Sequence, residues 1–258
     1  MFIDSHAHLE MKEFDQDRAE VIRRARDAGV TYIITVGTTL NYCRKALSIA
    51  EHNECVYAII GVHPHDVKSI NADTYDALRE LARRGKVVAY GEIGLDYFRN
   101  LSPKDVQLKR FAEQLELADA LDLPIVIHDR EAHIEIMRML KAWKGKKRGV
   151  VHCFSGDIEM GRECLDLGFY ISIPGPITFP KSGRLRSIVK DIPLESLLIE
   201  TDCPYLTPDP HRGKRNEPAF VVHTAQAIAD IKGISLEEVG RVTSRNAKDI
   251  FSLPIEIT

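Results

Sequence analysis

The sequence predicts an α/β fold, a single (β/α)₈ TIM barrel. Eight short runs rich in Val and Ile alternate with longer amphipathic runs over the 258 residues, and no linker-like or repetitive segment interrupts them. We therefore expect one continuous domain over residues 1–258, and the near-continuous apolar strands favour a parallel sheet covered by helices. A doubly wound open sheet is the competing fold, but the fingerprint Gly-x-Gly-x-x-Gly is absent after the first strand.

The expected elements follow one another in order along the chain. The eight strands are Phe2–Asp4, Tyr32–Val36, Val56–Ile60, Val87–Gly91, Pro124–His128, Gly149–His152, Phe169–Ile173 and Leu197–Glu200. The helices that follow them are Asp17–Ala28, Leu40–His52, Thr74–Arg83, Pro103–Leu121, Ala132–Trp143, Ile158–Leu167, Arg184–Lys190 and Phe220–Ile231. A ninth helical pattern, Leu236–Phe251, is expected to be an appendage after the eighth unit.

Glycine and proline mark several of these helix ends. Ser102 and Pro103 have the residue types of an N-cap and a first helical position. Gly29, Gly85 and Gly168 are placed to end helices just before a strand. These signals support the alternation of strands and helices.

Composition and charge exclude several classes of protein. The chain is 44% hydrophobic and 28% charged, which is ordinary for a soluble globular domain and excludes a disordered or low-complexity one. The longest apolar runs, such as Val56–Ile60, are far shorter than the roughly 20 residues that span a bilayer, so we expect no membrane contact. With 35 basic and 38 acidic residues the net charge is −3, so nucleic acid would have to be bound by local cations rather than by a long-range positive field.

The start of the chain and its cysteines favour the cytoplasm. The N-terminus reads Met-Phe-Ile-Asp-Ser-His, without a basic stretch and an apolar core, so a cytoplasmic location is expected. The five cysteines form no Cys-x-x-Cys pair, and we expect them to be reduced and mostly buried. Nothing in the sequence points to an obligate protein partner.

Polar side chains gather at the predicted carboxyl ends of the strands, where the sites of barrel enzymes lie. The first strand leads into His6 and His8, which point to the same side in extended backbone. The others, after the fourth, fifth, sixth and eighth strands, are Glu92, His128, His152 and Asp202. A single histidine near a strand end is more often a hydrogen-bonded core residue than a ligand. Four histidines, a glutamate and an aspartate at one mouth exceed the ligands of one tetrahedral ion and favour two divalent ions that share a carboxylate.

Two further residues could take part in the same chemistry. His63 follows the third strand in Gly61-Val-His-Pro-His65 and could bind metal or substrate, or protonate a leaving group. Glu200 lies two residues before Asp202 and could hold a third ion or orient a ligand. A buried carboxylate that only supports the others fits Glu200 equally well.

The ordered set of motifs resembles the TatD family of metal-dependent deoxyribonucleases, within the amidohydrolase superfamily. The resemblance covers essentially the whole chain and rests on Asp4-Ser-His-Ala-His8, Gly61-Val-His-Pro-His65, Gly91-Glu-Ile-Gly-Leu-Asp-Tyr97, Ile127-His-Asp-Arg130, His152-Cys-Phe-Ser-Gly156, Glu200-Thr-Asp-Cys-Pro-Tyr205 and Arg212-Gly-Lys-Arg-Asn-Glu-Pro218. No ligand position departs from the family pattern. The resemblance implies this assignment of ligands: one ion held by His6, His8 and Asp202, the other by His128 and His152, with Glu92 between them.

The resemblance also implies hydrolysis of DNA phosphodiester bonds, with 3′-to-5′ exonuclease activity, by water activated at the two ions. The ligands suit Zn²⁺ and Mn²⁺, while phosphoryl chemistry often uses Mg²⁺. We expect Asp202 to accept the proton of the water, and Glu92 and His63 are the other catalytic candidates. Single-stranded 3′ ends are the expected substrate, because a rigid duplex does not enter a barrel mouth without unpairing.

The basic residues divide according to the end of the barrel on which they are expected. Lys144-Gly-Lys-Lys-Arg148 precedes a strand, which places it at the bottom as a solvated loop. Arg130, Lys181 and the segment Arg212-Gly-Lys-Arg215 follow strands and lie on the metal side, so Arg130, Arg212 and Lys214 are candidates for phosphate contact. Five aromatic residues of the same loops could stack on a terminal base or simply pack, and these are Tyr205, Tyr97, Phe98, Phe154 and Phe179.

Two other functions stay open from the sequence alone. The same metal site could hydrolyse another bond, such as the ester of a D-aminoacyl-tRNA or an amide. A metal-dependent binding protein without turnover is less consistent with six intact ligands.

Overall fold

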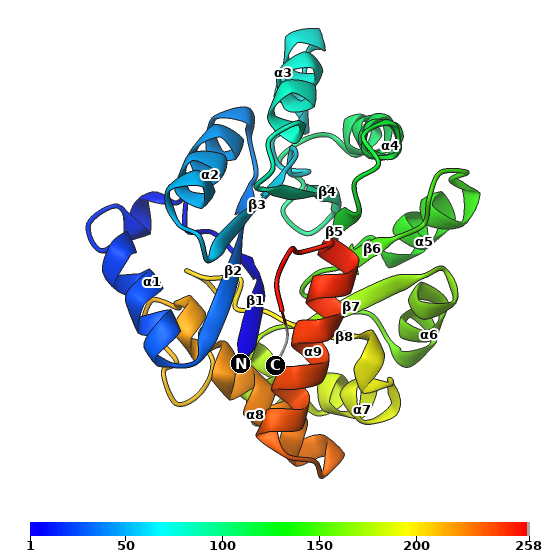
Figure 1. Cartoon of the computed structure of the whole chain (residues 1–258). Coiled ribbons are helices and arrows are strands. Elements are labelled where there is room, and N and C mark those ends of the chain that lie inside the picture. Colours follow the sequence, from blue (N-terminus) through cyan, green and yellow to red (C-terminus); the bar gives the residue numbers. More distant parts are fainter. Residues whose placement is uncertain (257–258) are drawn as a thin grey trace.

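Eight parallel strands pair in the order in which they occur along the chain, which confirms the predicted barrel (Figure 1). In this computed structural model, which describes residues 1–256, the strands are β1 (Phe2–Ala7), β2 (Val30–Gly37), β3 (Val56–Ile60), β4 (Val87–Asp96), β5 (Ile125–Arg130), β6 (Gly149–Val151), β7 (Phe169–Ile173) and β8 (Leu197–Ile199). The helices are α1 (Arg18–Asp27), α2 (Leu40–His52), α3 (Ala72–Ala82), α4 (Lys104–Ala120), α5 (His133–Ala142), α6 (Ile158–Asp166), α7 (Gly183–Asp191), α8 (Val221–Lys232) and α9 (Leu236–Phe251).

Alternate residues of each strand face the two sides of the sheet, and both sides are buried. On β2, Ile34 belongs to the apolar cluster inside the barrel, whereas Ile33 packs toward the outer helices. On β3, Tyr57 and Ile59 face inward in the same way. This two-residue period, with both faces buried, explains why the strands read as nearly continuous apolar runs.

The seam between β1 and β8 is closed by hydrogen bonds of side chains and loop backbone. The carboxylate of Asp4 accepts bonds from the backbone N–H of Thr201 at 3.0 Å and from its Oγ1 at 2.6 Å. One residue further on, the N–H of Asp202 donates to the carbonyl of His6 at 2.9 Å. These bonds hold Asp202 beside His6 and His8, although nearly 200 residues separate them in the chain.

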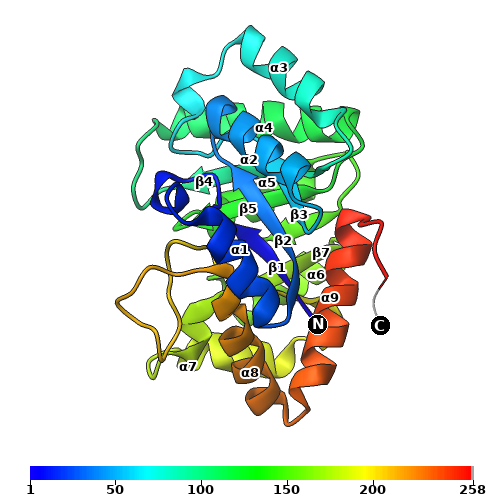
Figure 2. The same cartoon turned by 60° about the vertical axis from the view of Figure 1, so that its left-hand side comes forward.

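The last helix, α9, is not the appendage that the sequence predicted. Its residues Ala247, Ile250 and Phe251 join the apolar cluster of the barrel interior, together with Leu253 and Ile255. Figure 1 looks onto the end of the barrel that α9 crosses, and Figure 2 shows α9 at the side away from the strands' carboxyl ends. The apolar face of α9 therefore covers the bottom of the barrel. The helical pattern predicted an apolar face but not the surface against which that face packs.

The helix-end signals were right for two glycines and wrong for Gly85 and Ser102. Gly85 lies beyond the C-cap of α3 and does not have the left-handed backbone. Gly29 and Gly168 have φ of +85° and +88°, the left-handed backbone in which glycine ends a helix. Ser102 does not cap α4, because Pro103 occupies the cap position. The Ser102 hydroxyl instead donates to the carbonyl of His65 at 2.8 Å and so connects the loops after β3 and β4.

Three smaller expectations also agree with the structure. No helix within residues 1–256 is both long and apolar enough to cross a membrane. All five cysteines are free thiols, three of them buried and two half-buried. The basic loop before β6 lies at the bottom of the barrel, where Lys146 forms an exposed ion pair with Asp122 at 2.8 Å.

We expect Phe251→Ala to lower the free energy of unfolding by about 3–5 kcal/mol, because it removes a buried ring from the cluster that closes the barrel. Urea unfolding followed by circular dichroism measures this change. In the control Phe98→Ala, the lost ring is 60% exposed, and the decrease should stay below about 1 kcal/mol. Equal losses in the two variants would contradict the structural role of α9.

Candidate metal centre

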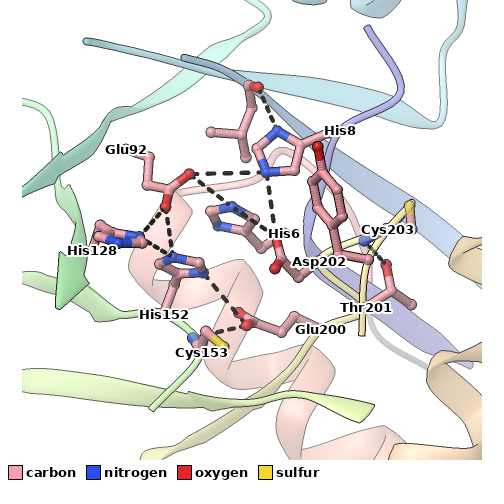
Figure 3. Close-up of polar contacts among 12 residues, drawn as sticks. His6, His8, Glu92, His128, His152, Cys153, Glu200, Thr201, Asp202 and Cys203 are labelled. Carbon is pink, nitrogen blue, oxygen red and sulfur yellow. Dashed lines mark hydrogen bonds and ion pairs between the residues drawn. The ribbon is translucent and has the colours of Figure 1, made fainter. Parts of the chain in front are cut away.

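The carboxylate of Glu92 lies buried at the centre of the predicted site, among imidazole rings (Figure 3). Its Oε1 lies 2.6 Å from Nδ1 of His128 and 2.7 Å from Nε2 of His152. The Nε2 of His63 lies 3.4 Å from the same oxygen. These rings come from the ends of β5 and β6 and from the loop after β3, so the barrel alone brings them together.

Three other predicted ligands gather on the Oε2 side of Glu92. This oxygen lies 3.4 Å from Nε2 of His6 and 3.9 Å from Nε2 of His8. Oδ1 of Asp202, held across the β1–β8 seam, lies 3.3 Å from Nε2 of His8 and 3.9 Å from Nε2 of His6. The two oxygens of Glu92 thus face two sets of side chains, the arrangement that a carboxylate shared by two ions requires.

The two sets touch each other, so all six predicted ligands form one continuous cluster. The rings of His6 and His152 stack with their centroids 4.0 Å apart and an angle of 11° between their planes. Three groups offer donor atoms within 4.8 Å of one another: His6 with His8 and Glu92, His63 with Glu92 and His128, and His6 with His152 and Asp202. The last group combines His152 from the Oε1 side of Glu92 with His6 and Asp202 from the Oε2 side.

Buried polar atoms without hydrogen-bond partners show that these residues fit divalent metal ions. Among the described residues, neither ring nitrogen of His6 has a hydrogen-bond partner, and Nδ1 of His152 and Oε2 of Glu200 also lack one. An unsatisfied buried polar atom costs about 1–3 kcal/mol, so such a concentration of them in one site calls for a ligand. Imidazole nitrogens and carboxylate oxygens together are the donors that Zn²⁺, Mn²⁺ and related ions take.

A further carboxylate lies behind each of three predicted ligand histidines. Nδ1 of His8 lies 3.2 Å from Oε1 of Glu10, and Nε2 of His128 lies 3.1 Å from Oδ2 of Asp96. Such partners select the tautomer of a ligand histidine and hold its ring in place. Neither Glu10 nor Asp96 was predicted from the sequence. Glu10 lies in the turn after β1 and Asp96 is the last residue of β4, two and four residues after a predicted ligand.

Glu200 occupies the equivalent position behind His152. Its Oε1 accepts a hydrogen bond from the backbone N–H of Cys153 at 2.8 Å and lies 3.5 Å from Nδ1 of His152. Glu200 is fully buried, and one of its oxygens is thus engaged with the chain. Its Oε2 has no hydrogen-bond partner among the described residues, so both roles predicted for Glu200, orienting a ligand and holding a third ion, stay predictions.

The surrounding groups keep the two central carboxylates ionised. Burial opposes the charge of Glu92, but the charge of His152 and the hydrogen bond from His128 hold the pKa of Glu92 well below its ordinary value. Burial also opposes the charge of Asp202, and the hydrogen bond and charge of His8 keep the pKa of Asp202 below its ordinary value. Both side chains are therefore anions at neutral pH, the state needed to bind a cation or accept a proton.

The hydrogen bond that His63 accepts decides which of its nitrogens carries the proton. Nδ1 of His63 lies 3.1 Å from the backbone N–H of His65, which can only donate, so Nε2 holds the proton and faces Glu92. Burial lowers the pKa of His63 to about 4, so its ring is neutral at pH 7. In this state His63 is a hydrogen-bond donor through Nε2 rather than a metal ligand through that atom.

A cavity of about 1020 Å³ opens above the cluster and contains part of the predicted substrate-binding set. Arg130 and Tyr205 line it, and Tyr205 is 52% exposed. Arg212 and Lys214 are exposed residues outside the cavity wall. Arg184 also lies in the wall of this cavity. It was not a candidate from the sequence, because it falls within a helical pattern.

Some of the rim residues have other partners. Arg215, in the same predicted basic segment, pairs with Asp17 at 2.7 Å and faces away from the metal cluster. Phe154, one of the aromatic candidates, is only 2% exposed and packs in the core. Phe98 is 60% exposed, so it is free to meet a ligand.

The fold and the site together define a class: metal-dependent hydrolases built on a (β/α)₈ barrel, with histidine and carboxylate ligands at the carboxyl ends of the strands. Within this class, the family described as TatD related DNase matches residues 3–252. The chain belongs to this family.

Similar proteins cover almost the whole chain. An uncharacterized metal-dependent hydrolase, YabD, from Bacillus subtilis (strain 168) is 42% identical over 255 residues, 98% of this chain and 100% of that protein. A protein of Pantoea ananatis (strain LMG 20103) named 3′-5′ ssDNA/RNA exonuclease TatD is 40% identical over 97% of this chain and 99% of its own length. The crystal structure of YJJV, a TatD homolog from Escherichia coli K12, has a TM-score of 0.93 at 32% identity and covers 98% of each chain.

We expect Glu92→Ala to weaken binding of metal at both sides of the cluster by more than about tenfold, because it removes the one carboxylate that lies near all four predicted ligand histidines. Metal analysis of the purified variant after dialysis measures this loss. The control Glu217→Ala removes a buried carboxylate that pairs with Arg24, outside the cluster, and should keep its metal.

Single ligand variants test how the metal is divided. His6→Ala and His152→Ala should each weaken a different ion. If either substitution removed all bound metal to the same extent as Glu92→Ala, the division of the ligands into two sets would be wrong.

Proposed function

We propose that this chain hydrolyses phosphodiester bonds of DNA and releases nucleotides from single-stranded 3′ ends. The observation that carries this proposal is the two-sided cluster around Glu92, which lies at the floor of a cavity of about 1020 Å³ with arginines at its rim. The name of the Pantoea relative, a 3′-5′ ssDNA/RNA exonuclease, supports the same reaction and polarity.

Two divalent ions are proposed to bind in this cluster, drawn from Mg²⁺, Mn²⁺ and Zn²⁺. The proposed ligands are His6, His8 and Asp202 for the first ion and His128 and His152 for the second, with Glu92 shared. When bound, two such ions lower the pKa of water and stabilise the negative charge that develops on phosphate oxygens during hydrolysis. The carboxylates behind His8, His128 and His152 would keep these rings oriented toward the ions.

Asp202 and His63 are proposed to perform the proton and hydrogen-bond steps. Asp202 is an anion next to His8 and lies at the cavity wall, so it can accept the proton of the attacking water. His63 is neutral and donates through Nε2, so it can hydrogen-bond a phosphate oxygen whose negative charge increases in the transition state.

The shape of the site favours the end of a single strand. Glu92 is 3% exposed and lies below the rim, so a phosphate must descend into the cavity to reach it. A terminal nucleotide can bend into such a pocket, whereas an internal one in duplex must first be unpaired at a cost of a few kcal/mol. Arg130, Arg212 and Lys214 are proposed to contact phosphates of the strand, and Tyr205 to stack on a base.

End-labelled single-stranded DNA tests the reaction directly. We expect a ladder that shortens from the 3′ end in the presence of at least one of the three ions, faster than cleavage of blunt duplex, with only slow nicking of closed circular duplex. Immediate internal fragments would contradict the exonuclease polarity. Hydrolysis of an aminoacyl-tRNA ester or a simple amide in parallel assays, without cleavage of DNA, would overturn the proposed function.

His63→Ala should lower kcat on single-stranded DNA by about 10²-fold, because it removes a donor to the developing charge. Its metal content should stay that of the unmodified protein, since Nε2 carries a proton and is not a ligand. His63→Gln keeps an N–H donor and should recover part of the rate. Loss of bound metal in His63→Ala would make His63 a ligand and contradict this role.

A further inference from the structure

An arginine and an aromatic ring form an exposed stacked pair at the rim of the metal cavity. The guanidinium carbon of Arg130 lies 4.1 Å from the centroid of the Phe98 ring, and Phe98 is 60% exposed. Arg130 is the last residue of β5 and follows the metal-ligand candidate His128 by two positions. Arg130 also lines the cavity. The pair therefore stands at the mouth, next to the Oε1 side of the cluster.

The pairing of β4 with β5 holds the stack in place. Asp96, the last residue of β4, pairs with Arg130 in the register of the two strands. The N–H of Tyr97 then donates to the carbonyl of Arg130 at 2.9 Å, so Phe98 comes from backbone that is tied to Arg130 itself. The carboxylate of Asp96 is turned inward, to the rings of His65 and His128.

The guanidinium group of Arg130 is held in one orientation by the Phe98 ring, but no carboxylate of the described residues neutralises its charge. Within residues 1–256, no carboxylate lies within 4.0 Å of its guanidinium, whereas Arg24 and Arg215 pair with Glu217 and Asp17. Stacking on an aromatic face contributes only about 0.5–1 kcal/mol at an exposed site and leaves the N–H edge of the guanidinium open. A planar cation held in this way is prepared for two parallel hydrogen bonds to a phosphate.

We propose that the Arg130–Phe98 pair binds the phosphate one nucleotide to the 5′ side of the bond that is cut. This inference rests on the proposed function. In a strand cleaved at its 3′-terminal phosphodiester, the terminal residue carries no phosphate on its 3′ side, so a phosphate next to the reacting one exists only on the 5′ side. The strand segment recognised by the enzyme then extends at least one phosphate beyond the reacting one, and Phe98 is a positioning residue that acts through Arg130.

Arg130 fits this position better than the other stacked arginine of the rim. Arg212 lies 4.4 Å from the centroid of the Phe179 ring, but only the ring and not the arginine lines the cavity. Arg130 lies on the cavity wall two residues from His128. Of these two stacked arginines, Arg130 is therefore the one within reach of a phosphate next to the metal cluster.

Two dinucleotides that differ by one phosphate test this subsite. Thymidylyl-thymidine contains only the bond to be cut, and its 5′-phosphorylated form adds the one phosphate assigned to Arg130. We expect kcat/KM to be about tenfold or more higher for the phosphorylated form, through a lower KM. In Arg130→Ala the ratio of kcat/KM between the two forms should fall to about one, because only the phosphorylated form carries the phosphate assigned to Arg130.

Phe98 variants separate positioning from simple support of the fold. Phe98→Ala should raise KM for the phosphorylated dinucleotide only, and Phe98→Tyr, which keeps an aromatic face, should restore it. The control Lys146→Ala removes a cation at the bottom of the barrel and should keep the full preference. An unchanged preference in Arg130→Ala, or an equal loss on both dinucleotides, would overturn the proposal.

A binding measurement distinguishes failure of this inference from failure of the proposed function. Fluorescence anisotropy of a labelled tetrathymidylate with phosphorothioate linkages, which resist hydrolysis, should show about tenfold weaker binding to metal-loaded Arg130→Ala than to metal-loaded Lys146→Ala. If no DNA is cleaved with any ion but this difference is found, the proposed function is wrong and the phosphate subsite stands. If DNA is cleaved but the difference is absent, the subsite assignment is wrong.

Discussion

The site depends on one buried carboxylate, Glu92. A buried anion is stable only when hydrogen-bond donors or cations surround it. Imidazole nitrogens lie within 3.9 Å of its oxygens on both sides, contributed by β1, β5, β6 and the loop after β3. A shift of one residue in the register of β4 would turn Glu92 toward the outer helices and leave these rings without a centre. The alternation of the strands is therefore as necessary to the chemistry as it is to the core.

The contacts that close the barrel also assemble the site. Asp202 reaches His6 and His8 only because Asp4 and Thr201 join the first and last strands. Around this centre the chain adds an outer set of buried carboxylates, of which Glu10 and Asp96 contact ring nitrogens that face away from Glu92. Carboxylates thus outnumber lysines and arginines near the floor of the cavity. A phosphate could approach this floor only if metal ions bound in the cluster and arginines at the rim offset the negative charge.

The eight strands and the convergence of the six predicted ligands could be predicted from local patterns in the sequence. Apolar runs of strand length mark the barrel, and the carboxyl ends of parallel strands share one mouth. Contacts between distant segments were not predictable in the same way. Arg212 and Arg215 look equivalent in the sequence, yet Arg215 pairs with Asp17, 198 residues away, and Arg212 does not. The proton position of His63 likewise depends on the backbone of His65, which no residue pattern encodes.

The position of α9 has a consequence for how a polymer would be handled. Because its residues Ile250 and Phe251 pack into the bottom of a barrel whose interior is already filled, a strand cannot pass through the molecule. Under the proposed function, substrate and product would therefore use the same opening, and a cleaved nucleotide would have to leave before the shortened strand could advance. A closed-ended cavity of this kind favours repeated encounters, with one nucleotide released at each, over continuous threading of a single strand.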